Sequence, residues 1–257
     1  MTALIHARGL TKRFGGVVAL HGLDLTMEAN EILGLIGPNG SGKTTFFNVV
    51  TGIYAADAGS VIFNGVDITR ASARQVYQAG ISRTFQRSRL SLALSIFDNI
   101  MIGNHKHLNQ GLWFNLLRRG AFRRELEASY QSARALIEVF EPALAERMLE
   151  PASGLPMIDR RRIEICRALI SGPKLLLLDE PSAGMTHDET RELMDDILLV
   201  RERNKNLTIV IVEHEMGVIE RITDRCLVLN FGRKIAEGTY RAVAADAKVQ
   251  EAYLGVA

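Results

Sequence analysis

Residues 31–45 read EILGLIGPNGSGKTT, and this stretch decides the fold. Its first six residues are mainly apolar and predict a buried strand, because a short apolar run ended by glycine is typical of strands in parallel sheets. The glycine-rich run Gly37–Gly42 follows, and Lys43 begins a predicted helix. Residues 37–44 match the pattern G-x-x-x-x-G-K-[ST] in the strand–loop–helix context that the pattern requires. The stretch therefore predicts a phosphate-binding loop in an α/β fold.

The chemistry of this loop predicts binding of ATP with Mg²⁺. Glycines allow successive backbone N–H groups to turn inward, and the helix N-terminus adds a partial positive charge. Lys43 is predicted to reach the β and γ phosphates, and the hydroxyl of Thr44 to ligate Mg²⁺. The residues predicted to bind nucleotide are Asn39, Gly40, Ser41, Gly42, Lys43, Thr44 and Thr45.

A second apolar segment, Lys174–Asp179, ends in two consecutive carboxylates. Asp179, at the tip of the predicted strand, is predicted to hold Mg²⁺ through water as the second part of the phosphate site. Glu180 is predicted to polarise the attacking water as a general base. An acidic strand end alone is more often a helix-start signal, so these roles depend on the phosphate loop.

Two further polar residues are candidates for the same site. His214 follows the apolar strand Leu207–Val212, and we expect this strand to lie beside the one that ends at Asp179. Gln86 falls where the core passes into a helical segment, and its amide is a candidate Mg²⁺ ligand and nucleotide sensor. For either residue alone, a structural role is the commoner reading.

The rest of the chain predicts one P-loop NTPase-type α/β domain. The N-terminal segment alternates and contains Gly15, Gly16 and Gly22, which indicates antiparallel strands and turns. Strands alternating with helices elsewhere favour a mainly parallel sheet with helices on both faces. The predicted parts are a core at about 1–90 and 163–235, an inserted helical subdomain at about 91–162 and a C-terminal tail at about 236–257.

Composition excludes several functional classes. The formal net charge of 257 residues is +2, which gives no electrostatic case for nucleic-acid binding. No apolar run approaches the roughly 18–20 residues of a membrane helix, and the N-terminus has no signal-peptide core. Cys166 and Cys226 lie in apolar segments and are predicted to be buried free thiols in a reducing cytosol. The six histidines lack metal-ligand spacing.

Taken together, the phosphate loop, Gln86, residues 179–182 and His214 resemble the ATPases of ABC transporters in order and spacing, essentially from end to end. Three stretches look most similar to the subunits that drive branched-chain amino-acid importers: residues 12–16, 111–124 and 252–255. The resemblance implies that Phe14 stacks on adenine with Val18 beside it, although Phe14 also fits a strand-edge aromatic. It implies transmembrane permease subunits, a second ATP-binding subunit and, indirectly, a periplasmic solute-binding protein as partners. The implied location is peripheral, on the cytoplasmic face of the cell membrane.

Two segments depart from the family pattern. The signature Leu-Ser-Gly-Gly-Gln aligns with Leu155–Asp159, where only the leucine agrees. Pro156 has neither hydroxyl nor N–H, and Asp159 adds a negative charge where phosphate is expected. A shift of three residues would bring in Ser153 and Gly154 instead. Thr186 stands where many relatives carry aspartate. The departure at Leu155–Asp159 predicts that the chain works in a heterodimer rather than a homodimer.

Two other functions remain open at the level of sequence. One is a soluble ABC ATPase outside transport, and the other is a regulatory ATP-binding subunit with weak hydrolysis. Residues 105–124 mix aromatic and basic side chains and allow a membrane-surface helix, but an exposed segment near a membrane partner is preferred. The triplet Arg160–Arg162 is predicted to be a solvated or phosphate-facing helix start.

Overall fold

The computed structural model describes residues 3–84, 90–106 and 119–254, which form two compact units. Unit 1 comprises residues 1–83, 174–181 and 201–257, and unit 2 comprises residues 84–173 and 182–200. Unit 2 is larger than the helical subdomain expected at 91–162, since it also takes residues on both sides of that range. Within the described ranges, no helix is both long and apolar enough to cross a membrane.

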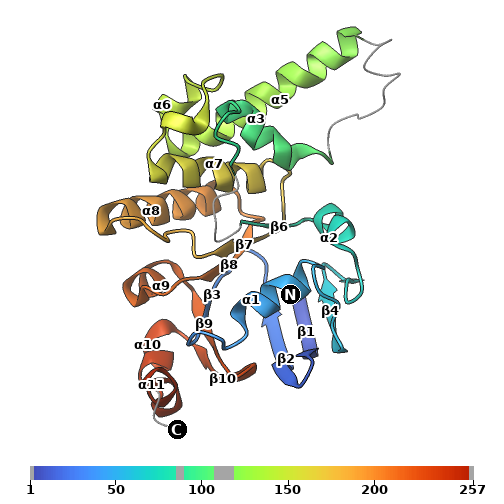
Figure 1. Ribbon diagram of the computed structural model, residues 1–257, viewed down its shortest axis with the longest axis vertical. Coiled ribbons are helices and arrows are strands. Elements are labelled where there is room, and N and C mark those ends of the chain that lie inside the picture. Colours follow the sequence, from blue (N-terminus) through green and yellow to red (C-terminus); the bar gives the residue numbers. More distant parts are fainter. Residues whose placement is uncertain (1–2, 85–89, 107–118, 255–257) are drawn as a thin grey trace. The chain divides into compact units, whose positions relative to one another are not determined.

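Unit 1 contains a six-stranded sheet that carries the phosphate-loop segment (Figure 1). Its strand order is β10-β9-β3-β8-β7-β6, and all neighbours are parallel except β9 and β10. The strands are β3 (Ile32–Ile36), β6 (Ile81–Arg83), β7 (Leu175–Asp179), β8 (Thr208–Val212), β9 (Arg225–Asn230) and β10 (Arg233–Gly238). This arrangement confirms the predicted mainly parallel sheet, and it places β8 beside β7 as expected.

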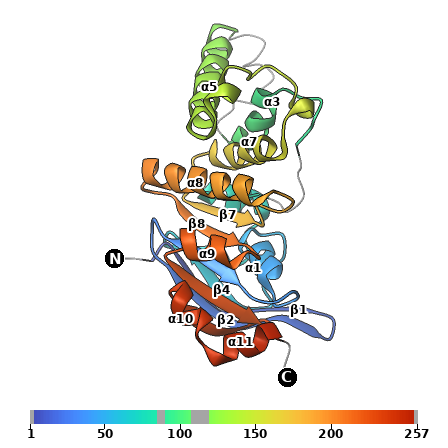
Figure 2. The same cartoon turned by 90° about the vertical axis from the view of Figure 1, so that its left-hand side faces the viewer.

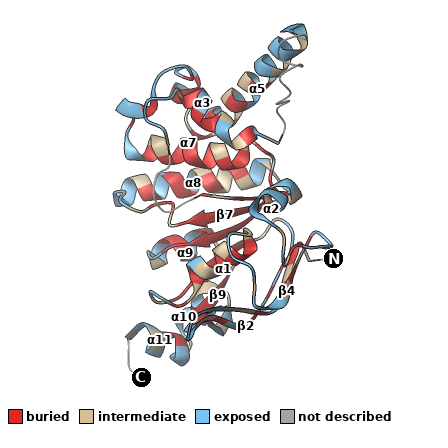
Figure 3. Cartoon of the chain, turned by 45° about the vertical axis from the view of Figure 1, so that its right-hand side comes forward, coloured by how far each residue is buried: buried red, intermediate tan, exposed pale blue. Residues whose placement is uncertain are grey.

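The central strands are apolar because both faces of the sheet are covered. Every residue of β3, β7 and β8 is buried, and Figure 3 shows β7 in the buried colour. Parallel strands of this kind read as continuous apolar runs rather than as alternating patterns. The helices of unit 1 are α1 (Lys43–Val50), α2 (Ala73–Ala79), α9 (Met216–Ile222), α10 (Tyr240–Ala244) and α11 (Ala247–Leu254). Helices α10 and α11 form the helical tail (Figure 2) and lie against β10 (Figure 1).

A second, antiparallel sheet in unit 1 has the order β2-β1-β4-β5. Its strands are β1 (Ile5–Phe14), β2 (Val17–Met27), β4 (Ala58–Phe63) and β5 (Val66–Asp67). This sheet confirms the N-terminal antiparallel part. One apolar core joins α1 with both sheets, and its largest fully buried side chains are Phe46 and Phe47 of α1 and Phe63 of β4. The core therefore fixes the helix that follows the phosphate loop.

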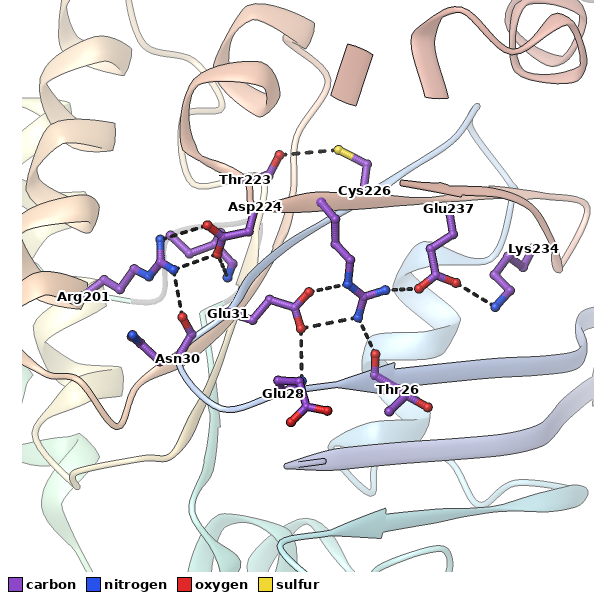
Figure 4. Close-up of polar contacts among 12 residues, drawn as sticks. Thr26, Glu28, Asn30, Glu31, Arg201, Thr223, Asp224, Cys226, Lys234 and Glu237 are labelled. Atoms are coloured by element: carbon purple, nitrogen blue, oxygen red, sulfur yellow. Dashed lines mark hydrogen bonds and ion pairs between the residues drawn. The ribbon is translucent and has the colours of Figure 1, made fainter. Parts of the chain in front are cut away.

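A polar network links the two sheets where β3 begins (Figure 4). Arg225 of β9 forms ion pairs with Glu31 and Glu237 and donates to the carbonyl of Thr26. Asp224 accepts from the N–H of Ile32 at 2.7 Å and pairs with Arg201 at 2.8 Å. These contacts lie at the amino-terminal end of β3, so they stabilise the sheet without taking up the loop at its other end.

The described elements of unit 2 are all helical, the type of structure expected for the inserted subdomain. Its elements are α3 (Ile96–Met101), the 3₁₀ turn η1 (Ile102–Asn104), α5 (Arg119–Phe140), α6 (Pro142–Ala145), the 3₁₀ turn η2 (Ala152–Gly154), α7 (Met157–Leu169) and most of α8 (His187–Arg203). At Gly103 a Cβ would lie 1.8 Å from the carbonyl oxygen of Arg167, so only glycine allows η1 to approach α7.

Two arginines of the triplet at the start of α7 are not solvated, which contradicts one of the two predicted environments. Arg161 and Arg162 are buried, at 5% and 3% exposure. Arg161 pairs with Glu164 at 2.8 Å, and Arg162 lies among four carboxylates. Those carboxylates are Glu141, Asp159, Glu192 and Asp196. The prediction of a solvated triplet was wrong because charged residues are buried when they are paired, and three of the four partners of Arg162 come from outside α7.

Candidate functional site

The loop between β3 and α1 is shaped by glycines that no other residue can replace. Gly37 has φ 148°, and a Cβ there would lie 2.1 Å from the carbonyl oxygen of Leu229. Gly42 has φ 110°, and a Cβ there would lie 2.6 Å from the carbonyl oxygen of Ala19. Both the conformation and the close approach require glycine. The loop is thus enclosed by β2 and by the end of β9.

The β9–β10 turn braces this loop from one side, a contact that the sequence did not reveal. The N–H of Gly232 donates to the carbonyl of Ser41 at 2.9 Å, and the carbonyl of Gly232 accepts from His21 at 2.8 Å. Phe231 and Gly232 both have positive φ, at 44° and 74°. A two-residue turn with both φ values positive is the common hairpin connection, and it brings the backbone of Gly232 against the loop.

Lys43 is turned back over its own loop. Its ammonium group donates to the carbonyl oxygens of Gly37 at 2.6 Å and Pro38 at 3.1 Å. Burial lowers the pKa of Lys43 from its usual value, while the charges of Glu180 and Asp179 oppose that shift. The ammonium thus lies in the field of both carboxylates that the sequence assigned to the same site.

The other loop residues suit an anionic ligand. Asn39, Gly40 and Thr44 are exposed, and Thr45 is half-buried. Among the described residues, the hydroxyl oxygen of Ser41 is buried without a hydrogen-bond partner. A buried hydroxyl without a protein partner is uncommon, and a ligand, an ion or a water molecule would satisfy it.

Asp179 lies at the tip of β7 and is 3% exposed. Its Oδ2 accepts from Nη2 of Arg83 at 2.5 Å. Arg83 is the last residue of β6, the strand next to β7, and its partner in the sheet is Leu177 of β7. Arg83 was not among the residues predicted from the sequence, and its only signal was its place three residues before Gln86.

The pairing of β7 with β8, which was expected, brings Glu180 and His214 together. Nε2 of His214 lies 2.8 Å from Oε1 of Glu180. The N–H of Glu180 also donates to the carbonyl of Val212 at 2.9 Å. Glu180 has φ 48°, a left-handed conformation that a non-glycine residue adopts at a cost of about 1–3 kcal/mol. Such strain clusters at functional sites, and here it turns the carboxylate toward the imidazole.

Phe14 lies at the end of β1 and is 43% exposed. Its ring meets that of Tyr54 edge to face, with centroids 5.2 Å apart and an interplanar angle of 74°. Nζ of Lys12 lies 5.4 Å from the centroid of the Phe14 ring. Val18 is half-buried and pairs with Arg13 across the β1–β2 hairpin. Tyr54 was not among the sequence candidates. Gln86 lies outside the described residues.

Of the residues that depart from the family pattern, Asp159 and Thr186 have local partners. Pro156 precedes the first residue of α7 and provides no side-chain cap, and Met157 is 41% exposed. Residues 152–154 form a separate 3₁₀ turn before this helix. Asp159 pairs with Arg162 at 3.1 Å, so its charge is partly offset. Thr186 caps α8: its hydroxyl accepts from the N–H of Glu189, whose carboxylate accepts from the N–H of Thr186.

Two families of ABC transporter proteins match this chain. The family described as ABC transporter matches residues 20–183, and the one described as branched-chain amino acid ATP-binding cassette transporter matches residues 233–257. The chain is 36% identical to the high-affinity branched-chain amino acid transport ATP-binding protein LivG of Escherichia coli K12, covering 99% of this chain and 98% of LivG. It is also 36% identical to the corresponding protein BraF of Pseudomonas aeruginosa, with the same coverage of each chain.

The structural comparison agrees with the sequence comparison. The fold matches the crystal structure of the ADP conformation of MJ1267, an ATP-binding cassette of an ABC transporter. The TM-score is 0.85 at 29% identity, covering 99% of this chain and 100% of that one. These findings confirm the predicted fold class and give no support to a function outside transport. The chain belongs to the ABC transporter family, as an ATP-binding and ATP-hydrolysing subunit.

Proposed function

We propose that this chain binds ATP with Mg²⁺ and that its hydrolysis drives import of branched-chain amino acids or a similar small solute. The observation that carries the proposal is the 2.8 Å contact between Nε2 of His214 and Oε1 of Glu180. The charge of Glu180 also acts on Lys43 of the phosphate loop, where it raises the pKa of the lysine against the effect of burial. The similarity to LivG and BraF supports the choice of solute.

The roles follow from the chemistry of each side chain. Backbone N–H groups of residues 39–45 and the ammonium of Lys43 bind the phosphates. Glu180 accepts a proton from the attacking water, and His214 orients that carboxylate. Phe14 stacks on adenine with Val18 beside it.

Oxygen donors at the site fit Mg²⁺, which prefers carboxylates, hydroxyls, phosphates and water. Asp179 and Thr44 are the proposed protein ligands, with Gln86 as a third. When bound, Mg²⁺ offsets the charge that develops on the phosphates during transfer.

The proposed partners are transmembrane permease subunits and a second ATP-binding subunit, with a periplasmic solute-binding protein acting indirectly. The proposed location is the cytoplasmic face of the cell membrane, held there by the permease. A heterodimer is favoured over a homodimer because of the sequence at Leu155–Asp159.

Replacement of Glu180 tests the catalytic proposal. Glu180→Gln keeps the size of the side chain and its contact with His214, but it removes the base. We expect ATP affinity to be retained and hydrolysis by the assembled transporter to fall by about 10²- to 10⁴-fold. Radiolabelled solute uptake in membrane vesicles should fall in parallel. A fall in hydrolysis of less than tenfold would remove Glu180 from the role of base.

A further inference from the structure

Arg83 places its positive charge against the carboxylate of Asp179. Its guanidinium donates to Oδ2 at 2.5 Å, and the two side chains are 6% and 4% exposed. Solvent therefore screens this pair little.

Two further contacts fix the guanidinium in place. Nη1 of Arg83 donates to Oδ1 of Asn48 at 2.6 Å. The guanidinium carbon lies 5.2 Å from the centroid of the Phe47 ring. Asn48 and Phe47 belong to α1, which begins at Lys43. Arg83 thus connects the helix after the phosphate loop with the tip of β7, and the rigid fork of donors suits this use.

A carboxylate that serves Mg²⁺ has to be held in place, because the ion demands near-ideal octahedral geometry. Groups that hydrogen-bond to a metal ligand orient that ligand, and their loss typically lowers metal affinity by about 10- to 100-fold. Oδ2 of Asp179 is held by Arg83 in this way, at the proposed metal site.

We propose that Arg83 is a positioning residue for the metal, which holds Asp179 in the orientation that Mg²⁺ needs when it arrives with ATP. This inference rests on the proposed binding of ATP with Mg²⁺. Arg83 differs from Lys43 in the group that it contacts. Lys43 is proposed to bind the phosphates, whereas Arg83 binds the carboxylate of Asp179. Its removal should therefore affect the part of nucleotide affinity that depends on metal.

The experiment measures the dissociation constant of ATP by calorimetry, once with excess Mg²⁺ and once with EDTA. The ratio of the two constants is the gain that Mg²⁺ provides. For Arg83→Met we expect this gain to fall by about tenfold or more, within the range for partners of metal ligands, while affinity in EDTA is unchanged. Arg83→Lys keeps the charge but loses the fork, and we expect it to recover part of the gain.

Arg201→Met is the matched control. Arg201 also forms an ion pair with an aspartate in unit 1, with Asp224 at 2.8 Å, but at the amino-terminal end of β3. This variant should keep the wild-type gain, and circular dichroism should show all variants folded. If Arg83→Met does not fold, Arg83→Lys with an unchanged gain overturns the inference.

The outcomes separate this inference from the proposal beneath it. If wild-type affinity is the same with Mg²⁺ and EDTA, the proposed metal site fails and Arg83 loses its role with it. If the wild type shows a gain that Arg83→Met retains, only the inference on Arg83 fails. An equal loss of affinity with and without Mg²⁺ also overturns it, because Arg83 would then support phosphate binding or the fold.

Discussion

At the scale of single residues, the site combines strained backbone with buried charge. Glu180 has a left-handed backbone conformation, and Gly37 and Gly42 have positive φ at points where a Cβ would collide with backbone. Lys43 is 7% exposed and donates to two carbonyl oxygens. The surrounding core fixes these conformations, since an isolated loop would relax them.

Replacement of Lys43 should separate phosphate binding from folding. Lys43→Ala removes the charge-assisted contacts to phosphate, which are among the strongest hydrogen bonds in proteins. We expect calorimetry to detect no ATP binding at micromolar concentration, while circular dichroism stays that of the wild type. Lys234→Ala is the control, because Lys234 pairs with Glu237 on β10, outside the phosphate loop. Equal affinity of Lys43→Ala and wild type would contradict the prediction.

Replacement of Phe14 should lower the affinity for all adenine nucleotides by the same factor. Stacking of a base on an aromatic ring contributes about 1–3 kcal/mol, so Phe14→Ala should weaken ATP and ADP by the same factor, about 5- to 150-fold. Phe122→Ala is the control, because Phe122 has nearly the same exposure, 40% against 43%, and lies in unit 2. A loss confined to ATP would show that Phe14 serves the phosphates instead. Unchanged affinity would make it a strand-edge aromatic.

At the scale of elements, ion pairs link α7 to α8. Arg162 of α7 contacts Glu192 at 2.5 Å and Asp196 at 2.9 Å, both on α8, as well as Asp159 and Glu141. Burial is the largest influence on Asp196 and raises its pKa to about 6, although Arg162 opposes the shift. Glu192 and Glu141 raise it further by repulsion. The pairing of the two helices therefore depends on pH.

The stability of this pairing should fall as pH rises from about 4 to about 6. In that window Asp196 is protonated in the folded state and ionised in the unfolded state. Because the folded state binds the additional proton, the free energy of unfolding falls as pH rises. A shift of about two pKa units corresponds to at most about 3 kcal/mol. Urea unfolding followed by helical circular dichroism at pH 4 and pH 7 measures the change.

Asp196→Asn should abolish this dependence, because the amide does not titrate. The difference in unfolding free energy between variant and wild type should move in favour of the variant as pH rises. Asp188→Asn is the control, since the side chain of Asp188 is 94% exposed on the same helix. If wild type and Asp196→Asn change in parallel between the two pH values, Asp196 does not carry the effect.

At the scale of the whole molecule, the start of α7 bears on how two subunits combine. In ABC dimers, as the family resemblance implies, each ATP lies between one phosphate loop and the opposing signature. This chain offers Pro156, Met157 and Ile158 at the helix start, with no side-chain cap. The loss of one preorganised donor costs about 10²- to 10³-fold in rate, so two copies of this chain should form a slow pair.

Steady-state hydrolysis should expose this asymmetry. The purified chain alone should turn over slowly, and addition of the permease and a second ATP-binding subunit with an intact signature should accelerate it. A chain carrying Pro156→Ser, Met157→Gly, Ile158→Gly and Asp159→Gln together should turn over faster alone than the wild type. Brisk hydrolysis by the unaltered chain, about 1 to 10³ per second, would defeat the heterodimer proposal.

The sequence alone determined the local features of this protein. The apolar runs 31–36 and 174–179 predicted buried strands, and the glycine spacing before Lys43 predicted the loop and the start of α1. Each of these features depends on neighbouring residues, through periodicity, backbone freedom and the strand–loop–helix order. The neighbouring positions of β7 and β8 were also inferred correctly, which brought His214 to Glu180.

Only the tertiary structure decided which distant side chains meet. The contacts of Arg83 with Asp179, of Tyr54 with Phe14 and of Gly232 with Ser41 join segments that local patterns do not relate. The environment of the arginine triplet was predicted wrongly for the same reason. A charged residue is buried or exposed according to its partners. The partners of Arg162 lie up to 34 residues away in the sequence. Burial of charge is a property of the assembled core, and so it is settled only once the chain has folded.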